Sequence, residues 1–301
     1  MLLSSLHAAH IRHLSSMRRS PATLIYYRYG LEPLVEFLKA QNIAADTDVI
    51  TRAVLTEFQL WLRETRGLGP GGEHAVLRAI RATFRWALFE ELIDKDPTLK
   101  IRMPALPKER PPAVQPHEVA ACLKVAAELS QPLRNKALLL FLYDTGLRQG
   151  EVLQLETDDI DLNTGQITIR GSTAKGGRGR TVPLGIKSAR AIARYERHER
   201  KPALPMIRTL FLSRTGEPMT KGGLTHLLVK IAAAAGLPRD HVAPHAWRRG
   251  FAVGYLRNGG DMFSLQQILG HQTLDMTRRY VKYLPSDIQR QHLRASPADR
   301  L

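Results

Sequence analysis

The chain has 301 residues, and its 44 lysines and arginines against 28 acidic residues give a formal net charge of +16. This excess exceeds what solubility requires and favours a polyanionic partner, foremost a nucleic acid; a generally basic protein without such a partner is the alternative. With 44% hydrophobic residues the chain can bury a core, which excludes a disordered protein, and its length suits two domains. The first residues carry neither a signal peptide nor a membrane span, so we expect a cytoplasmic protein with no membrane partner.

The first hundred residues are typical of a helical domain. Ser20 and Pro21 form an N-cap and first-turn pair before an apolar face at Leu24, Tyr27, Leu31, Leu34 and Leu38. Pro33 lies inside this pattern and is expected to kink the helix or to split it. A second helix is expected over about residues 55–64, and a third runs through residues 76–88 after the cluster RGLGPGGEH.

The third helix carries a basic stripe on the face opposite its apolar residues. Steps of four, three and four residues align its members, which are His74, Arg78, Arg81 and Arg85. A stripe of arginines without acidic partners can follow the phosphates of a DNA backbone, although a solvated helix face gives the same pattern. We therefore take the stripe as a candidate DNA contact.

Five prolines between residues 101 and 116 interrupt helical structure and predict a linker there, between a domain at 1–100 and one at 117–301. In the second domain, HEVAACLKVAAEL and NKALLLFLYDTGL predict helices; the first buries the lone Cys122, and the second is buried on all sides. GQITIRG and RTVPL predict a β-hairpin around the turn STAKGGRG, and further helices are expected at 187–199, 221–235, 244–257 and SLQQILG. The predicted fold is mainly α with a small antiparallel β region.

Two segments of the second domain hold arginines that are candidates for a catalytic or ligand-binding role. In DTGLRQGEVLQL, Arg148 follows the buried helix after a Thr-Gly break, and Glu151 can hold its guanidinium in place; a purely structural ion pair would have the same spacing. In PHAWRRGFA, His245 and Arg248 share a helical face, so the adjacent Arg249 must point elsewhere, where backbone phosphates are candidate partners.

The segment LGHQTLDMTRRYVKY adds His271 after a glycine, Tyr280 nine residues later and Tyr283 beyond it. Each of these alone is a weak signal, because single histidines and tyrosines mostly have structural roles. No metal site or cofactor is predicted: Pro244 interrupts the helix between His241 and His245, and no cysteine or carboxylate completes a ligand set.

Taken in chain order, these residues resemble the catalytic set of the tyrosine recombinases, the family of phage integrases and Xer-type recombinases. The positions that carry the resemblance are Arg148, Lys175 in TAKGGRGRTVPL, His245, Arg248, His271 and Tyr280. It implies a helical, SAM-like core-binding domain and a mixed α/β catalytic domain that clamp double-stranded DNA between them. Trp247, Arg249 and Gly250 depart from the motif that usually surrounds the second arginine.

The resemblance also implies roles for the matched residues. Tyr280 would be the nucleophile, with Tyr283 as its rival, and Lys175 on the hairpin would be the general acid. Arg178 and Arg180 would contact phosphate or substitute for Lys175. Because a phenol with a pKa near 10 needs help to ionise, either His245 or the cationic surroundings would promote its deprotonation, and His271 would bind a phosphate oxygen.

The implied reaction cuts and rejoins DNA through a covalent 3′-phosphotyrosine, without metal or ATP. The implied assembly is a homotetramer on paired DNA sites, joined through a C-terminal tail from about residue 284, with a second recombinase or an accessory protein as a further partner and the nucleoid as its place of action. A type IB topoisomerase and a non-catalytic DNA-binding regulator on the same fold are the alternatives. The regulator would be expected to lack a catalytic group, and none is missing.

Overall fold

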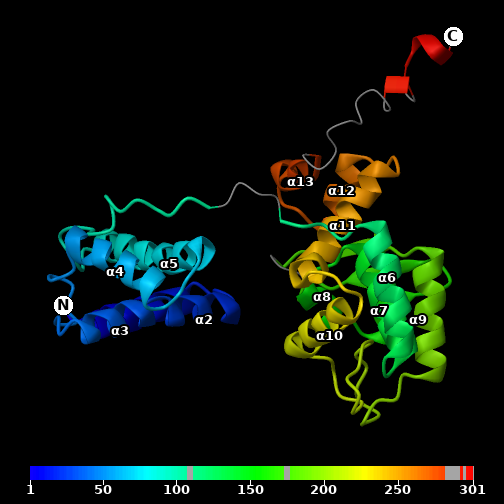
Figure 1. Ribbon diagram of the computed structural model, residues 1–301, viewed down its shortest axis with the longest axis horizontal. Coiled ribbons are helices and arrows are strands. Elements are labelled where there is room, and N and C mark those ends of the chain that lie inside the picture. The colour runs from blue at the N-terminus through cyan, green and yellow to red at the C-terminus, as the bar shows by residue number, and fades with distance from the viewer. Residues whose placement is uncertain (107–110, 173–176, 282–291, 294–295, 301) are drawn as a thin grey trace. The chain divides into compact units, whose positions relative to one another are not determined.

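The computed structural model describes residues 1–106, 111–172, 177–281, 292–293 and 296–300. The chain divides into two compact units, Met1–Glu109 and Arg110–Leu301, at a point inside the predicted proline-rich linker (Figure 1). The described residues are mostly helical with one small antiparallel sheet, which confirms the predicted fold class. None of the helices in these ranges is long and apolar enough to cross a membrane.

The described part of the first unit forms five helices. In chain order they are α1 (Leu3–Ser16), α2 (Pro21–Gly30), α3 (Glu32–Ala40), α4 (Arg52–Glu64) and α5 (Pro70–Phe89). The Ser20 hydroxyl accepts from the Thr23 backbone N–H and Pro21 occupies the first turn, so the predicted N-terminal signal of α2 is confirmed. Pro33 splits the predicted helix rather than kinking it, because α3 starts afresh with this proline in its first turn.

The core of the first unit joins one apolar face from each of four helices. Leu34 and Phe37 of α3 meet Leu55 and Phe58 of α4, and Leu77, Ile80 and Phe84 of α5 complete the cluster. Leu3 and Leu6 also belong to this core, so α1 is an integral part of the unit although the sequence reading began its helices at Ser20. The basic stripe on α5 is therefore carried by a helix that is fixed along its opposite face.

The second unit is built around a buried helix. Its helical elements are α6 (Pro116–Glu128), α7 (Pro132–Thr145), α8 (Gln149–Leu153), η1 (Thr157–Asp159), α9 (Ile186–His198), α10 (Lys221–Ala234), η2 (Arg239–Val242), α11 (Pro244–Arg257), α12 (Met262–Leu269), α13 (Leu274–Val281) and η3 (Ala298–Arg300). The helix α7 packs against α6, α9 and α11, and these helices lie together in Figure 1. Leu138, Phe141 and Leu142 of α7 are fully buried, as its uniformly apolar sequence predicts, and Cys122 of α6 is buried in the same core.

A three-stranded antiparallel sheet with the order β1-β2-β3 completes the second unit, with β1 at Ile160–Asp161, β2 at Gln166–Ile169 and β3 at Arg180–Pro183. In the β2–β3 pair, Ile167 faces Val182 and Ile169 faces Arg180, so the predicted hairpin is confirmed. Ile167, Ile169 and Val182 bury one face of the sheet. Arg180, at the start of β3, is thus fixed in the strand pair next to the hairpin turn.

Candidate active site

Arg148 is placed by the glycine break that ends α7. Gly146 adopts a left-handed conformation (φ 58°), and a Cβ at this position would lie 2.2 Å from the Phe251 ring, so only glycine fits. The chain then passes the buried Leu147 and reaches Arg148 as the N-cap residue of α8. The Arg148 side chain is 20% exposed, which leaves part of its guanidinium open to a ligand.

Glu151 holds Arg148 from one turn further along α8. Its carboxylate, 2% exposed, accepts from Arg148 Nη1 at 2.9 Å and from the Arg148 backbone N–H at 2.9 Å. Burial raises the pKa of Glu151, but the hydrogen bonds and charge of Arg180, with those of Arg148, outweigh it and hold the pKa below its usual value. The carboxylate is therefore ionised and orients the Arg148 fork.

Arg180 is the second partner of Glu151. Its Nη1 and Nη2 donate to the two Glu151 oxygens at 3.0 and 2.9 Å, and its Nε donates to the Ile268 carbonyl at 2.8 Å. Three donors of a side chain that is only 11% exposed are thus committed to protein acceptors. Arg180 therefore anchors Glu151, a contact that the sequence did not predict. The predicted contact of Arg178 and Arg180 with phosphate, or their substitution for Lys175, stays a prediction; Arg178, two residues earlier, is exposed.

Arg248 reaches the same place from α11. Its Nη1 donates to the Gly146 carbonyl at 2.7 Å and its Nη2 to the Leu269 carbonyl at 2.9 Å, while Arg148 Nη2 donates to the next carbonyl, that of Gly270, at 3.2 Å. The two arginines therefore converge on the carboxyl end of α12, where the helix dipole favours positive charge. Burial, with the nearby charge of Arg148, lowers the pKa of Arg248 to about 10, which still leaves it charged at neutral pH.

His271 and Tyr280 complete the cluster. Gly270 ends α12 in a left-handed conformation (φ 62°) and turns the chain into His271, whose Nε2 lies 3.0 Å from Arg248 Nη2. The His271 ring stacks on the ring of Tyr280 of α13, with centroids 6.0 Å apart and planes 15° apart. Burial and the charge of Arg248 lower the pKa of His271 to about 4, so the imidazole is neutral at pH 7.

The structure thus brings together four of the six residues predicted to be catalytic: Arg148, Arg248, His271 and Tyr280. His245 is exposed on the first turn of α11, one turn before Arg248. Lys175, its hairpin turn and the rival Tyr283 lie outside the described residues, as does most of the predicted tail from residue 284. The adjacent Arg249 donates through Nε to the Pro112 carbonyl at 2.6 Å, so it ties α11 to the segment before α6.

The four residues of the basic stripe on α5 differ in their contacts and exposure. Arg78 donates to the Tyr26 hydroxyl at 3.2 Å and lies over the Tyr26 ring, whereas Arg81 donates to the Thr98 and Ile101 carbonyls at 3.2 and 3.0 Å. Arg85 is exposed and His74 is half-buried. Because Arg81 binds two backbone carbonyls, it has a structural role. Contact with DNA stays a prediction for all four residues of the stripe.

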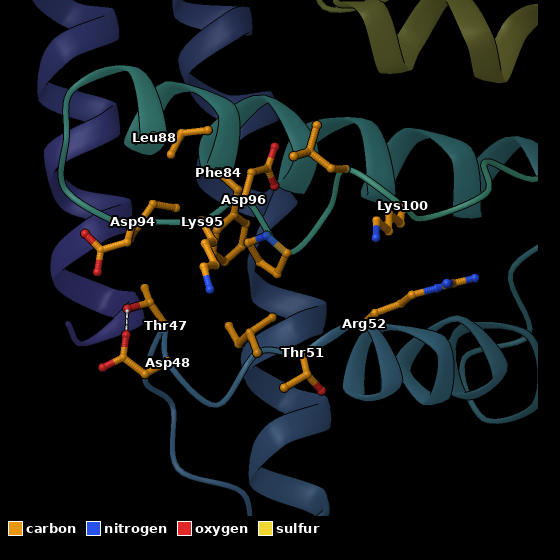
Figure 2. A pocket seen from close by; sticks show the side chains of 14 residues that line it. Thr47, Asp48, Thr51, Arg52, Phe84, Leu88, Asp94, Lys95, Asp96 and Lys100 are labelled. Atoms are coloured by element: carbon orange, nitrogen blue, oxygen red, sulfur yellow. Dashed lines mark hydrogen bonds between the residues drawn. The ribbon is translucent and has the colours of Figure 1, made fainter.

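A pocket of about 710 Å³ in the first unit contains none of these candidate residues (Figure 2). Phe84 and Leu88 of α5 line it together with residues 47, 48, 50–52, 93–97, 99 and 100, and the Thr47 hydroxyl donates to the Asp48 carboxylate. Its charged residues are mixed in sign: Asp48, Asp94 and Asp96 against Arg52, Lys95 and Lys100. This balance does not suit a polyanion, whereas the partly exposed arginine cluster of the second unit does.

Both units match known protein families. Residues 113–286 match the phage integrase family, and residues 3–103 match the phage integrase SAM-like domain. Tyrosine recombinase XerC of a Roseiflexus species is 32% identical over 279 residues, which cover 90% of this chain and 87% of the relative. Tyrosine recombinase XerD of Pseudomonas putida is 32% identical over 282 residues, which cover 92% of each protein.

Solved structures share the fold at lower sequence identity. The integrase of transposon Tn1549, solved in complex with a circular intermediate DNA, has a TM-score of 0.76 at 22% identity and is matched over 93% of this chain and 95% of its own. A λ integrase dimer bound to a core site has a TM-score of 0.74 at 21% identity, with 93% of this chain and 77% of its own covered. The matched families and the relatives confirm the resemblance seen in the sequence: the chain belongs to the phage integrase family of tyrosine recombinases.

Proposed function

We propose that this protein is a site-specific DNA recombinase that cleaves and rejoins strands through a covalent 3′-phosphotyrosine on Tyr280. The observation that carries the proposal is the cluster in which Arg148 and Arg248 donate to successive carbonyls at the end of α12, Arg248 contacts His271, and His271 stacks on Tyr280. Positive groups and a phenol gathered in this way suit attack on a phosphodiester, which is itself negatively charged and gains charge on its equatorial oxygens during the reaction.

Arg148 and Arg248 bind the nonbridging oxygens of the scissile phosphate in this proposal. A guanidinium has five N–H donors, and the contacts of Arg248 with two carbonyls and with His271 commit three of them, so donors are left for phosphate. Both groups are fixed before DNA arrives, so little reorganisation is needed when charge develops. Loss of either guanidinium should lower the rate of cleavage by about 10²–10³, by analogy with the removal of an oxyanion-hole donor.

The Tyr280 oxygen then attacks phosphorus, and the 5′ oxygen of the neighbouring nucleotide leaves. Lys175 is assigned the protonation of that leaving oxygen, and His245 or the surrounding cations the deprotonation of the phenol. His271 Nε2 accepts from Arg248 in the DNA-free protein, so it donates to a phosphate oxygen only after it takes up a proton, which the charge of the phosphate favours. One phosphodiester is exchanged for another throughout, so the reaction needs no ATP.

The proposed partner is double-stranded DNA, because the Tn1549 and λ integrases were solved bound to DNA. We assign the working assembly as a homotetramer on two paired sites, held together through the tail from about residue 284, in the cytoplasm at the nucleoid. Relatives carry the two names XerC and XerD, which makes a second recombinase a further candidate partner.

Covalent trapping tests the proposal and identifies the target. A pool of duplexes with random sequence around a nick, which lets the cleaved strand end diffuse away, is incubated with the protein, and DNA that stays bound in detergent is sequenced. Tyr280→Phe should trap no DNA, while Tyr283→Phe should trap it at the wild-type level. Trapping by Tyr280→Phe at the wild-type level would overturn the proposal.

Two further assays separate the alternatives. Relaxation of supercoiled plasmids that lack the trapped sequence would favour a type IB topoisomerase, whereas strand exchange only between duplexes that carry the sequence supports a recombinase. A non-catalytic regulator would bind the sequence and form no covalent complex with it.

A further inference from the structure

Thr277 lies on α13 three residues before Tyr280, so the two side chains share one face of the helix. It is fully buried, and its hydroxyl oxygen lies 2.8 Å from His271 Nδ1. His271 therefore contacts both residues of this face, Thr277 through a hydrogen bond and Tyr280 through ring stacking. This arrangement links the helix of Tyr280 to Arg248 through a single imidazole.

The contacts of His271 determine where its proton resides. A guanidinium N–H can only donate, so the 3.0 Å contact with Arg248 Nη2 requires a lone pair on His271 Nε2. The imidazole is neutral at pH 7, because burial and neighbouring arginines keep its pKa at about 4. A neutral imidazole carries one N–H, which must then be on Nδ1 and donate to the Thr277 hydroxyl.

The opposite tautomer would disrupt the contact between His271 and Arg248. With the proton on Nε2, two donors would face each other across the contact between His271 and Arg248. Because a hydroxyl can accept or donate, Thr277 accepts from Nδ1–H in the tautomer that Arg248 selects. A side chain of the same shape without the oxygen leaves Nδ1–H without this acceptor and the ring without this restraint.

We propose that Thr277 is a positioning residue for the DNA cleavage reaction: its hydroxyl accepts the Nδ1–H of the tautomer that Arg248 selects, and so fixes the His271 ring with Nε2 directed at the Arg248 guanidinium beside Tyr280. The inference rests on the proposed recombinase function. It adds to the site an uncharged residue, which acts through the imidazole of His271.

Three variants test this role with the trapped duplex as substrate. Thr277→Val removes the hydroxyl at nearly constant volume and should slow formation of the covalent complex at saturating DNA by about 10–100-fold, by analogy with the loss of a partner that orients a metal-bound histidine. Thr277→Ser restores a hydroxyl and should recover most of the rate. Thr56→Val, the same exchange at an exposed position of α4, is the control and should leave the rate unchanged.

A double-mutant cycle distinguishes positioning from packing. In a His271→Ala background, Thr277→Val should have no further effect on the rate, because the group through which it acts is gone. Equal reductions by Thr277→Val in both backgrounds would overturn the proposal, as would a Thr277→Ser variant as slow as Thr277→Val.

A spectroscopic measurement on the unmodified protein covers the case in which Thr277→Val fails to fold. In DNA-free protein labelled with ¹⁵N-histidine, the His271 signal, assigned by its loss in His271→Ala, should report a proton on Nδ1. A proton on Nε2 would overturn the inference and leave the proposed function intact. Trapping by Tyr280→Phe would instead overturn the proposed function.

Discussion

Glu151 offers a sharp test of how the arginine cluster is held. Replacement of Glu151 by glutamine keeps the shape of the side chain and removes its charge. Oε1 accepts from Arg148 Nη1 and Arg180 Nη1, and Oε2 accepts from Arg180 Nη2 and the Arg148 backbone N–H. Whichever oxygen becomes the amide nitrogen, its N–H groups therefore face two donors, and two guanidinium groups lose their counter-charge.

The expected cost follows from the burial of the pair. Removal of one partner of a buried ion pair costs about 3–5 kcal/mol, and the lower part of that range applies here because Arg148, 20% exposed, can regain some hydration. About 3–4 kcal/mol corresponds to a fall in melting temperature of about 6–16 °C for a domain of this size. Affinity for DNA should not decrease, since a negative charge has been removed, whereas cleavage should slow by about 10²-fold as Arg148 loses its orientation.

Thermal unfolding can be followed through Trp247, which is fully buried in α11 of the second unit, in a background with Trp61→Phe and Trp86→Phe. Glu156→Gln is the matched control, because Glu156 also pairs with an arginine but is 37% exposed and should cost less than about 1 kcal/mol. A Glu151→Gln variant that melts with this control and cleaves at the wild-type rate would refute the reasoning.

Two predictions concern the first unit. Burial lowers the pKa of His10 to about 4 from 6.5, so the unfolded chain binds its proton first and the stability present above pH 6.5 is lost as pH falls toward 4, by about 3 kcal/mol at most. Urea titrations followed by Trp61 and Trp86 should show this loss in the wild type and not in His10→Gln; a midpoint independent of pH would contradict it. Arg85→Ala should reduce the salt dependence of DNA binding by about one phosphate contact, measured by fluorescence anisotropy over a salt series, and an unchanged slope would count against a DNA contact at Arg85.

Local signals in the sequence were sufficient for most of the fold. A capping serine with proline in the first turn located α2, and a uniformly apolar stretch ended by glycine located α7, because these residues act on the backbone within a few positions. The helices α1 and α13 were missed for a physical reason. The buried face of α1 includes His10, and α13 is sparsely apolar, so both depend on neighbours that supply packing from elsewhere in the chain.

For the candidate site, the sequence predicted which residues take part and their order along the chain. It did not predict the contacts between them. Arg148, Arg248, His271 and Tyr280 were found from their order along the chain and its resemblance to the tyrosine recombinase set. Glu151 and Arg180, in contrast, are 29 residues apart and meet through the packing of the second unit, in which β3 also contacts α12. Similarly, helical periodicity placed Arg81 on the basic stripe without revealing the carbonyls of Thr98 and Ile101 that it binds. Periodicity reports which face a side chain occupies, whereas its partner depends on tertiary packing.

The crowding of Arg148, Arg180 and Arg248 around one carboxylate links fold stability to substrate. Their mutual repulsion is a standing cost in the DNA-free protein, and a phosphate supplies the missing anion, so bound DNA should raise the melting temperature of the second unit. Selection for heat resistance without DNA would favour a new acidic side chain beside Arg248. That side chain would occupy the position of the phosphate, so the more stable variant would lose DNA cleavage.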